Sequence, residues 1–153
     1  KEQVRAYRER VKRAARGRLQ WIAVAYADFR AARSPAPVEI VLEAADAGCA
    51  GVLFDTFRKD GKSLLDWLPP DELTRLVERT VALGLSAALA GAVDMDHLPK
   101  IACIPADIVA VRSAVCIDGE RRGSVSSRRV RRFCDAMAAT FPARPVAALQ
   151  ARR

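Results

Sequence analysis

Hydrophobic residues along this chain occur in two kinds of segment. In some segments apolar residues follow one another almost without interruption, and in others they recur every three or four positions among charged residues. The first kind predicts strands buried on both faces, as in parallel sheets, and the second predicts amphipathic helices. We expect four strands, at 19–26, 49–54, 85–89 and 107–111, and we expect the first of them to be buried on both sides.

Helices are expected before the first strand and after each strand. The periodic segments are 2–16, about 37–47, 69–84, a short helix that Asp94 caps and that runs through Ile101, and a last helix that begins at Ser126 or Ser127. Prolines at first turns and glycines at helix ends support these boundaries. A short helical turn is expected at 62–67. The last helix is expected to pack through Val130, Phe133, Cys134 and Met137.

One helix followed by four strand–helix units predicts an α/β protein. Short connections between continuous apolar strands imply right-handed βαβ units and a parallel sheet. We expect residues 1–141 to form one unit, with 1–17 as a leading helix, and 142–153 to form a tail without a clear pattern. Parallel strands share a direction, so their carboxyl ends lie on one side, where α/β proteins place their sites. The strands end at Asp28, Asp55, Gly91 and Arg112.

Positive charge is concentrated in two places. The 153 residues carry a formal net charge of +8, most of it within residues 1–18. A second cluster consists of Arg121, Arg122, Arg128, Arg129, Arg131 and Arg132. Because no recognition motif and no interleaved aromatic residues accompany either cluster, we expect solvated helix faces rather than nucleic-acid binding.

Composition narrows the chemistry further. The four cysteines form no C-x-x-C pair and three of them fall in apolar surroundings, so we expect buried thiols in a reducing cytoplasm. A single histidine, His97, argues against a histidine-based metal site and a Ser-His-Asp triad. No apolar stretch is long enough to cross a membrane, and we expect no metal or organic cofactor.

The most informative stretch follows the second strand. Asp55, Thr56, Lys59 and Asp60 arrive together where the apolar run ends. A carboxylate near an amine keeps that amine charged and can relay protons, and a lysine at the end of a strand can neutralise a substrate phosphate. From the residues alone, a structural ion pair between Asp55 and Lys59 is an equally good interpretation.

Several runs of sequence resemble one family. They are D-T-x-x-K-D-G-K-S-L at 55–64, L-A-G at 89–91, D-I-V-x-V-R-x-A-x-C at 107–116, Y-A-D at 26–28 and A-D-A-G-C at 45–49. Over about residues 21–133 the chain resembles the (5-formylfuran-3-yl)methyl phosphate synthase family of methanofuran biosynthesis. The first run is long and specific enough to make a chance match improbable.

The resemblance implies a fold and an activity. Members of that family are (β/α)8 barrels that condense two molecules of glyceraldehyde 3-phosphate, using a Schiff-base lysine on an early strand and a second lysine that accepts a proton. Both lysines precede the stretch that this chain resembles. A barrel needs roughly 200–250 residues and eight strands, so the resemblance implies a parallel half-barrel, strands five to eight of eight. This chain alone is then expected to make no product.

The resemblance also suggests roles for residues. Asp55 and Lys59 fall on the family's D-T-x-x-K motif and are the expected catalytic pair. Gly91, Arg112 and Ser113 end strands whose loops often hold phosphate, so they are expected to bind substrate phosphate. Arg112 forming a salt bridge, perhaps with Asp55, is an alternative. Asp28 is a weaker candidate for substrate binding, and a loop-capping role is about equally well supported.

The expected partner is a triose-phosphate substrate, without nucleic acid or membrane. Four parallel strands leave two open sheet edges, which favour association. The missing N-terminal half or a second copy of the chain could cover them. An alternative function is therefore a non-catalytic half-barrel module that binds phosphate or forms oligomers.

Overall fold

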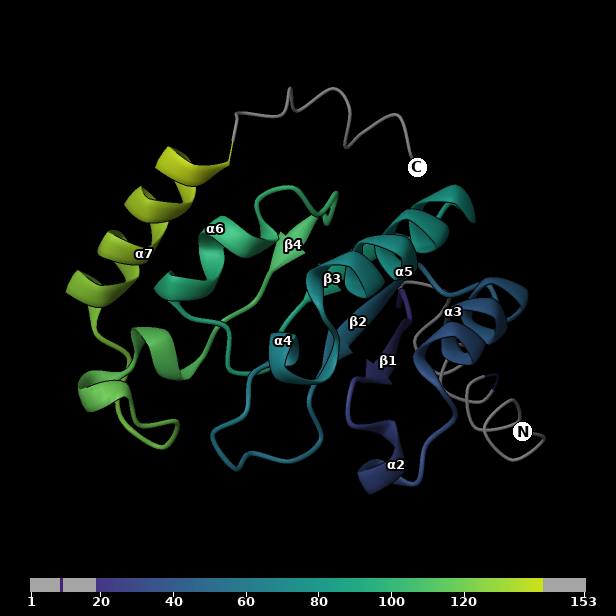
Figure 1. Cartoon of the computed structure of the whole chain (residues 1–153), viewed down its shortest axis with the longest axis horizontal. Coiled ribbons are helices and arrows are strands. Elements are labelled where there is room, and N and C mark those ends of the chain that lie inside the picture. The colour runs from purple at the N-terminus through teal and green to yellow at the C-terminus, as the bar shows by residue number, and fades with distance from the viewer. Residues whose placement is uncertain (1–8, 10–18, 142–153) are drawn as a thin grey trace.

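The fold is seen in a computed structural model that describes residue 9 and residues 19–141 (Figure 1). The expected leading helix at 2–16, apart from Glu9, and the expected tail at 142–153 lie outside the described residues. Within the described part of the chain, no helix is both long and apolar enough to cross a membrane.

A four-stranded parallel sheet forms the centre of the structure. Its strands follow the order of the sequence: β1 (Ile22–Tyr26), β2 (Gly51–Asp55), β3 (Ser86–Leu89) and β4 (Ile108–Val109). Each strand lies beside the next in parallel register. The predicted α/β class and parallel sheet are confirmed. The last strand is shorter than predicted, because only two of its residues pair with β3.

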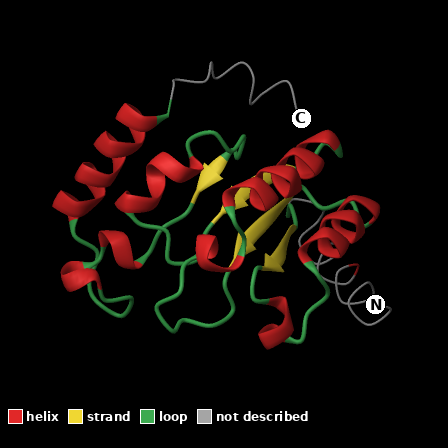
Figure 2. Cartoon of the chain, viewed as in Figure 1, coloured by secondary structure: helices red, strands yellow, loops and turns green. Residues whose placement is uncertain are grey.

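Helices connect the strands and mostly match the predicted segments (Figure 2). Their bounds are α2 (Phe29–Ala32), α3 (Pro37–Asp46), α4 (Leu64–Trp67), α5 (Pro70–Ala82), η1 (Met95–His97), α6 (Leu98–Ile101), η2 (Ser113–Val115), η3 (Ile117–Gly119) and α7 (Ser127–Thr140), where η denotes a 3-10 helix. The expected helix before Ile101 is divided into η1 and α6. Asp94 caps η1, as predicted, by accepting a hydrogen bond from Asp96 N at 3.0 Å. The short helix α2 was not predicted.

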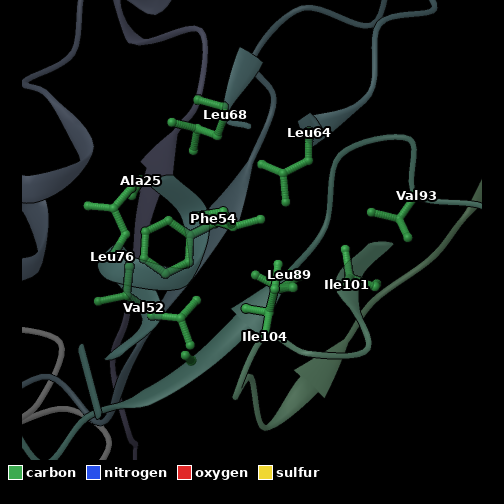
Figure 3. Close-up of a cluster of buried hydrophobic side chains, with 14 of the residues drawn as sticks. Ala25, Val52, Phe54, Leu64, Leu68, Leu76, Leu89, Val93, Ile101 and Ile104 are labelled. Atoms are coloured by element: carbon green, nitrogen blue, oxygen red, sulfur yellow. The ribbon is translucent and has the colours of Figure 1, made fainter. Parts of the chain in front are cut away.

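The hydrophobic core lies between one face of the sheet and the helices α3 and α5. Alternate strand residues point to this face, and Figure 3 shows Phe54 beside Ala25, Val52 and Leu76. Phe54 is fully buried, and burying a side chain of this size stabilises the fold by about 1.5–3 kcal/mol. This packing fixes β2, and therefore the position at which the Asp55 segment leaves the sheet.

The opposite face of the sheet is partly open. Ile22, Val24 and Ile108 alternate with the core residues, and their side chains are 50%, 38% and 55% exposed. The prediction that the first strand is buried on both sides is therefore wrong for this structure. Its continuous apolar run is typical of a strand with both faces covered, whereas the described helices α3 and α5 pack on the face of Ala25.

The last helix also packs less closely than predicted. Phe133 is buried, and Met137 is half-buried against the core, but Cys134 and Val130 are exposed. Cys103 is exposed as well, so the prediction of buried thiols is wrong for Cys103 and Cys134. Val130 and Cys134 are exposed because α7 lies mainly against the short elements η2 and α6, and Figure 1 shows α7 beside α6 at one side of the structure.

Candidate active site

The segments that follow the first three strands meet at the carboxyl edge of the sheet. Ala27 N donates to the backbone oxygen of Asp55 at 2.8 Å, and Ala90 N donates to the backbone oxygen of Phe54 at 2.8 Å. These bonds continue the parallel ladder beyond the strand ends. As a result Asp28, Asp55 and Gly91 lie in neighbouring positions, as expected for parallel strands.

Lys59 is held against the end of β2 by three acceptors. Its Nζ lies 3.0 Å from Asp55 Oδ1 and 3.2 Å from Thr56 Oγ1, and it also donates to the backbone oxygen of Thr56. An ammonium group has three donors, so all of them are used here. Lys59 is therefore a fixed cation in this structure and not a free amine.

The Asp55 carboxylate is oriented from two sides. Oδ1 accepts hydrogen bonds from Lys59 Nζ and, at 2.7 Å, from the backbone N–H of Thr56. Within the described residues Oδ2 has no hydrogen-bond partner. The side chains of Lys59 and Asp55 are 33% and 25% exposed, so the pair is screened by solvent and contributes less than about 1 kcal/mol to stability. This geometry leaves one carboxylate oxygen available to a bound molecule.

Asp28 holds the loop that carries Lys59. Its carboxylate is buried, and its two oxygens accept the backbone N–H groups of Phe57 at 2.6 Å and Arg58 at 2.9 Å. Burial raises the pKa of Asp28, but the amides of Arg58 and Phe57 and the charge of Lys59 outweigh it, so its pKa lies below the ordinary value. Because both oxygens are occupied, the geometry favours the loop-capping interpretation of Asp28.

Gly91 permits the close approach of the β2 and β3 ends. Its φ is +94°, and a Cβ at this position would lie 2.9 Å from Thr56 N and 3.2 Å from Asp55 Oδ1. Its backbone oxygen also accepts the N–H of Leu64 at 2.8 Å. Gly91 thus contacts both ends of the loop between β2 and α4, which explains why a glycine follows the third strand here.

Arg112 and Ser113 lie beyond the neighbouring strand, β4. Arg112 is exposed, and its Nε donates to the backbone oxygen of Arg121 at 3.2 Å. The alternative salt bridge between Arg112 and Asp55 is not formed, and among the described residues Asp55 forms its ion pair with Lys59. Ser113 begins η2. Within the described residues, no hydrogen bond or ion pair joins Arg112 or Ser113 to Asp55 or Lys59.

Comparison with known proteins decides the family. A family model described as 4-HFC-P synthase matches residues 1–134. The chain belongs to this 4-HFC-P synthase family. The matched range contains every candidate site residue, from Asp28 to Ser113.

Curated relatives agree with this family membership. Proteins named (5-formylfuran-3-yl)methyl phosphate synthase are similar to the chain. One from Methanopyrus kandleri is 38% identical over 118 residues, which cover 76% of this chain and 50% of that protein. One from Methanococcus maripaludis is 40% identical over 100 residues, covering 65% and 42%. One from Methanocaldococcus jannaschii is 36% identical over 109 residues, covering 71% and 46%. The chain spans about half the length of the curated relatives it matches.

Two aromatic residues, Tyr26 and Phe57, lie beside the candidate site of this member of the 4-HFC-P synthase family. The sequence had not indicated that they belong there. Tyr26 is the register partner of Asp55, so the two side chains point to the same face of the sheet. The Tyr26 and Phe57 rings meet edge to face, with centroids 5.5 Å apart and planes at 72°. Phe57 is 51% exposed. The signal that could have identified Phe57 is an aromatic residue within an otherwise polar loop.

Asp66 also escaped the sequence analysis. It accepts hydrogen bonds from Ser63 N at 2.6 Å and Ser63 Oγ at 2.8 Å, which cap α4. These bonds lower the pKa of Asp66. The S-x-x-D spacing is a capping-box signature that was available in the sequence. The motif loop is therefore held by Asp28 near its start and by Asp66 at its end.

Proposed function

We propose that this chain supplies four consecutive βα units to an enzyme that condenses two molecules of glyceraldehyde 3-phosphate into (5-formylfuran-3-yl)methyl phosphate. One observation carries the proposal. The D-T-x-x-K run lies at the carboxyl edge of a parallel sheet, with the Lys59 ammonium fixed on the Asp55 carboxylate. The name of the relatives gives the product, and the family resemblance implies the substrate.

The geometry supports different roles for Lys59 and Asp55. The condensation eliminates phosphate and water, so protons must move and negative charge must be stabilised as bonds break. Lys59 has all its donors engaged and is suited to hold charge near a substrate phosphate or a departing phosphate. Asp55 Oδ2 is suited to accept a proton or a substrate hydroxyl hydrogen bond. A carbonyl-attacking amine must be free, so the Schiff base is assigned to a lysine outside this chain.

Four further residues complete the proposed site. Gly91 and the start of η2 at Ser113 follow adjacent strands, where backbone N–H groups commonly hold phosphate. Arg112 would add a positive charge at the same edge. Asp28 acts as a positioning residue, because its oxygens hold the loop amides and not the substrate.

We further propose that residues 1–141 correspond to strands five to eight of a (β/α)8 barrel. The four-stranded parallel order and the half-length match support this correspondence. The other four units, with the two lysines that the family resemblance implies, would then pack on the open face at Ile22, Val24 and Ile108. The enzyme is a phosphate-eliminating lyase of the cytoplasm in this proposal, and the 153-residue chain alone makes no product.

The test is an assay of the full-length parent protein with glyceraldehyde 3-phosphate, read by mass spectrometry for the furan aldehyde phosphate. The expected result is product from the parent and none from the isolated chain. Absence of product from a folded parent would refute the proposed reaction. A borohydride-trapped substrate adduct on the isolated chain would refute the assignment of the Schiff base elsewhere.

The open sheet face also supports a second candidate. A half-barrel with exposed apolar residues could act as a non-catalytic module that binds phosphate and associates with a second copy. Analytical sedimentation of the chain distinguishes the two. A dimer that makes no product, together with an inactive parent, favours this candidate. A stable monomer whose β1 and β4 edge amides are protected from exchange argues against it.

A further inference from the structure

A concave surface lined by arginines lies on α7, away from the D-T-x-x-K loop. Its lining residues are Met95, Ala114, Arg128, Arg129 and Arg132, and its volume is about 260 Å³. The hollow lies where α7 contacts η2, and Met95 of η1 also lines it. We refer to it as the arginine hollow. None of its residues belongs to the proposed active site.

No carboxylate of residues 19–141 neutralises the arginines of the hollow. Within residues 19–141 no carboxylate lies within 4.0 Å of the guanidinium group of Arg128, Arg129 or Arg132. Even Asp135, on the following turn of α7, forms no ion pair with them. Three like charges around one concave surface concentrate positive potential there, because a hollow focuses the field of its walls.

The position along the helix adds to this potential. The three arginines occupy the first two turns of α7, where the helix dipole is positive and cations are disfavoured. Acidic residues are absent from the first turn of α7, whereas α3 has Glu39 and α5 has Asp71 and Glu72 in theirs. A bound anion would relieve the repulsion among the arginines and the unfavourable dipole together.

The shape of the hollow indicates the size and class of the anion. Arginine guanidinium groups bind phosphate oxygens through paired N–H donors. The volume is below the range of typical drug-sized pockets, which suits a small molecule. Non-specific binding of single-stranded nucleic acid commonly uses aromatic platforms, and none of the described residues that line the hollow is aromatic.

We propose that the arginine hollow binds a small phosphorylated anion, such as a phosphate monoester or pyrophosphate. Met95 and Ala114 supply an apolar wall that a short carbon skeleton can contact. The site goes beyond the proposed furan-forming reaction, and it does not depend on Asp55 or Lys59.

The test uses isothermal titration calorimetry with the 153-residue chain and inorganic pyrophosphate at physiological ionic strength. The expected result is saturable binding. The double variant Arg128→Gln/Arg132→Gln should lose at least tenfold in affinity. The matched control, Arg122→Gln/Arg131→Gln, removes the same charge from exposed positions outside the hollow and should change affinity less than twofold. Glutamine keeps helix propensity, and circular dichroism checks that both variants fold.

Several outcomes would overturn the proposal. Equal losses in the two double variants would show diffuse electrostatic attraction and not a site. Absent or unsaturable binding of both pyrophosphate and orthophosphate would remove the site. Tighter binding of a single-stranded oligonucleotide, weakened equally by both variants, would replace it with a nucleic-acid surface. In the parent enzyme, Arg128→Gln/Arg132→Gln should leave kcat/KM for product formation unchanged, because neither residue belongs to the proposed active site, and this separates the result from a failure of the proposed reaction.

Discussion

Replacing Asp28 with asparagine tests whether a buried carboxylate holds the loop of the candidate site. In the structure its two oxygens accept the amides of Phe57 and Arg58. Asparagine has nearly the same shape but offers one oxygen and one NH2 group. Whichever way it turns, one backbone N–H faces another donor, and the negative charge is lost.

The expected cost follows from this geometry. A hydrogen bond to a charged group contributes about 1.5–3 kcal/mol, and a donor left without a partner costs a similar amount when buried. Water can reach a loop whose residues Phe57 and Arg58 are exposed, which offsets part of the loss. We expect the Asp28→Asn variant to lose about 2 kcal/mol of unfolding free energy at pH 7.

The pH dependence gives the sharper test. The folded pKa of Asp28 lies below its ordinary value. A depressed carboxylate pKa contributes stability that is fully present above the unfolded pKa, about 3.9, and is lost as the pH falls through the folded value. The difference in stability between the unmodified chain and Asp28→Asn should therefore be constant from pH 5 to 7 and shrink as the pH falls toward 3.

Urea unfolding followed by circular dichroism at several pH values measures this difference. Asp60→Asn is the matched control, because it removes a carboxylate from the exposed part of the same loop. The control should change stability by less than about 0.5 kcal/mol. Hydrogen exchange at the Phe57 and Arg58 amides should accelerate only in Asp28→Asn. Equal stability of the two variants at pH 7, or a stability difference between the unmodified chain and Asp28→Asn that grows in acid, would refute the role of Asp28 in holding the loop, which we call the Asp28 clamp.

Three further predictions concern other parts of the chain. Lys59→Met should abolish product formation by the parent enzyme while changing stability by less than about 1 kcal/mol, because the ion pair is solvent-exposed; unchanged kcat/KM would contradict the proposed role. Gly91→Ala should lower stability by about 2–3 kcal/mol, combining left-handed strain with the clash at Thr56. The matched control is Gly48→Ala, at φ +65° with no atom within 4 Å of its Cβ, which should lower stability by only about 1 kcal/mol. Thermal unfolding of both variants measures the difference. Ile108→Asn should change the stability of the chain by less than about 1 kcal/mol. If the open face is covered in the parent enzyme, the same change should reduce its assembly in gel filtration. Normal assembly would contradict that packing.

The spacing of apolar and polar residues predicted those helices and strands whose apolar residues are buried within the described chain. The helices α3 and α5 were predicted closely, because proline marks their first turn and a glycine follows each of them. Alternation could not predict the open face of β1, since a continuous apolar run has the same appearance whether its second face is covered by this chain or by another. The short pairing of β4 was also not predictable, because it depends on how far β3 extends beside it.

The candidate site was predictable at the level of segments and not at the level of contacts. The shared direction of parallel strands is enough to predict that Asp28, Asp55 and Gly91 lie at the carboxyl edge of the sheet. The pairing of Lys59 with Asp55 was one of two interpretations that their arrival together after the second strand suggested. The partners of Asp28 were not predictable, because they are backbone amides about thirty residues away. The sequence does not reveal such contacts, since every residue except proline can donate its backbone N–H.

These contacts explain how an exposed loop can carry a fixed charge. Residues 57–62 are exposed, and a solvated loop of this length would ordinarily leave a lysine mobile. Here Asp28 holds the loop amides from behind, Gly91 accepts the amide of Leu64 at its end, and Asp66 caps the helix that follows. Lys59 therefore reaches Asp55 from a backbone that is anchored on both sides. Electrostatic stabilisation depends on charges that do not have to reorganise when substrate reacts, so the buried clamp at Asp28 is as much a requirement of the proposed chemistry as the pair that it positions.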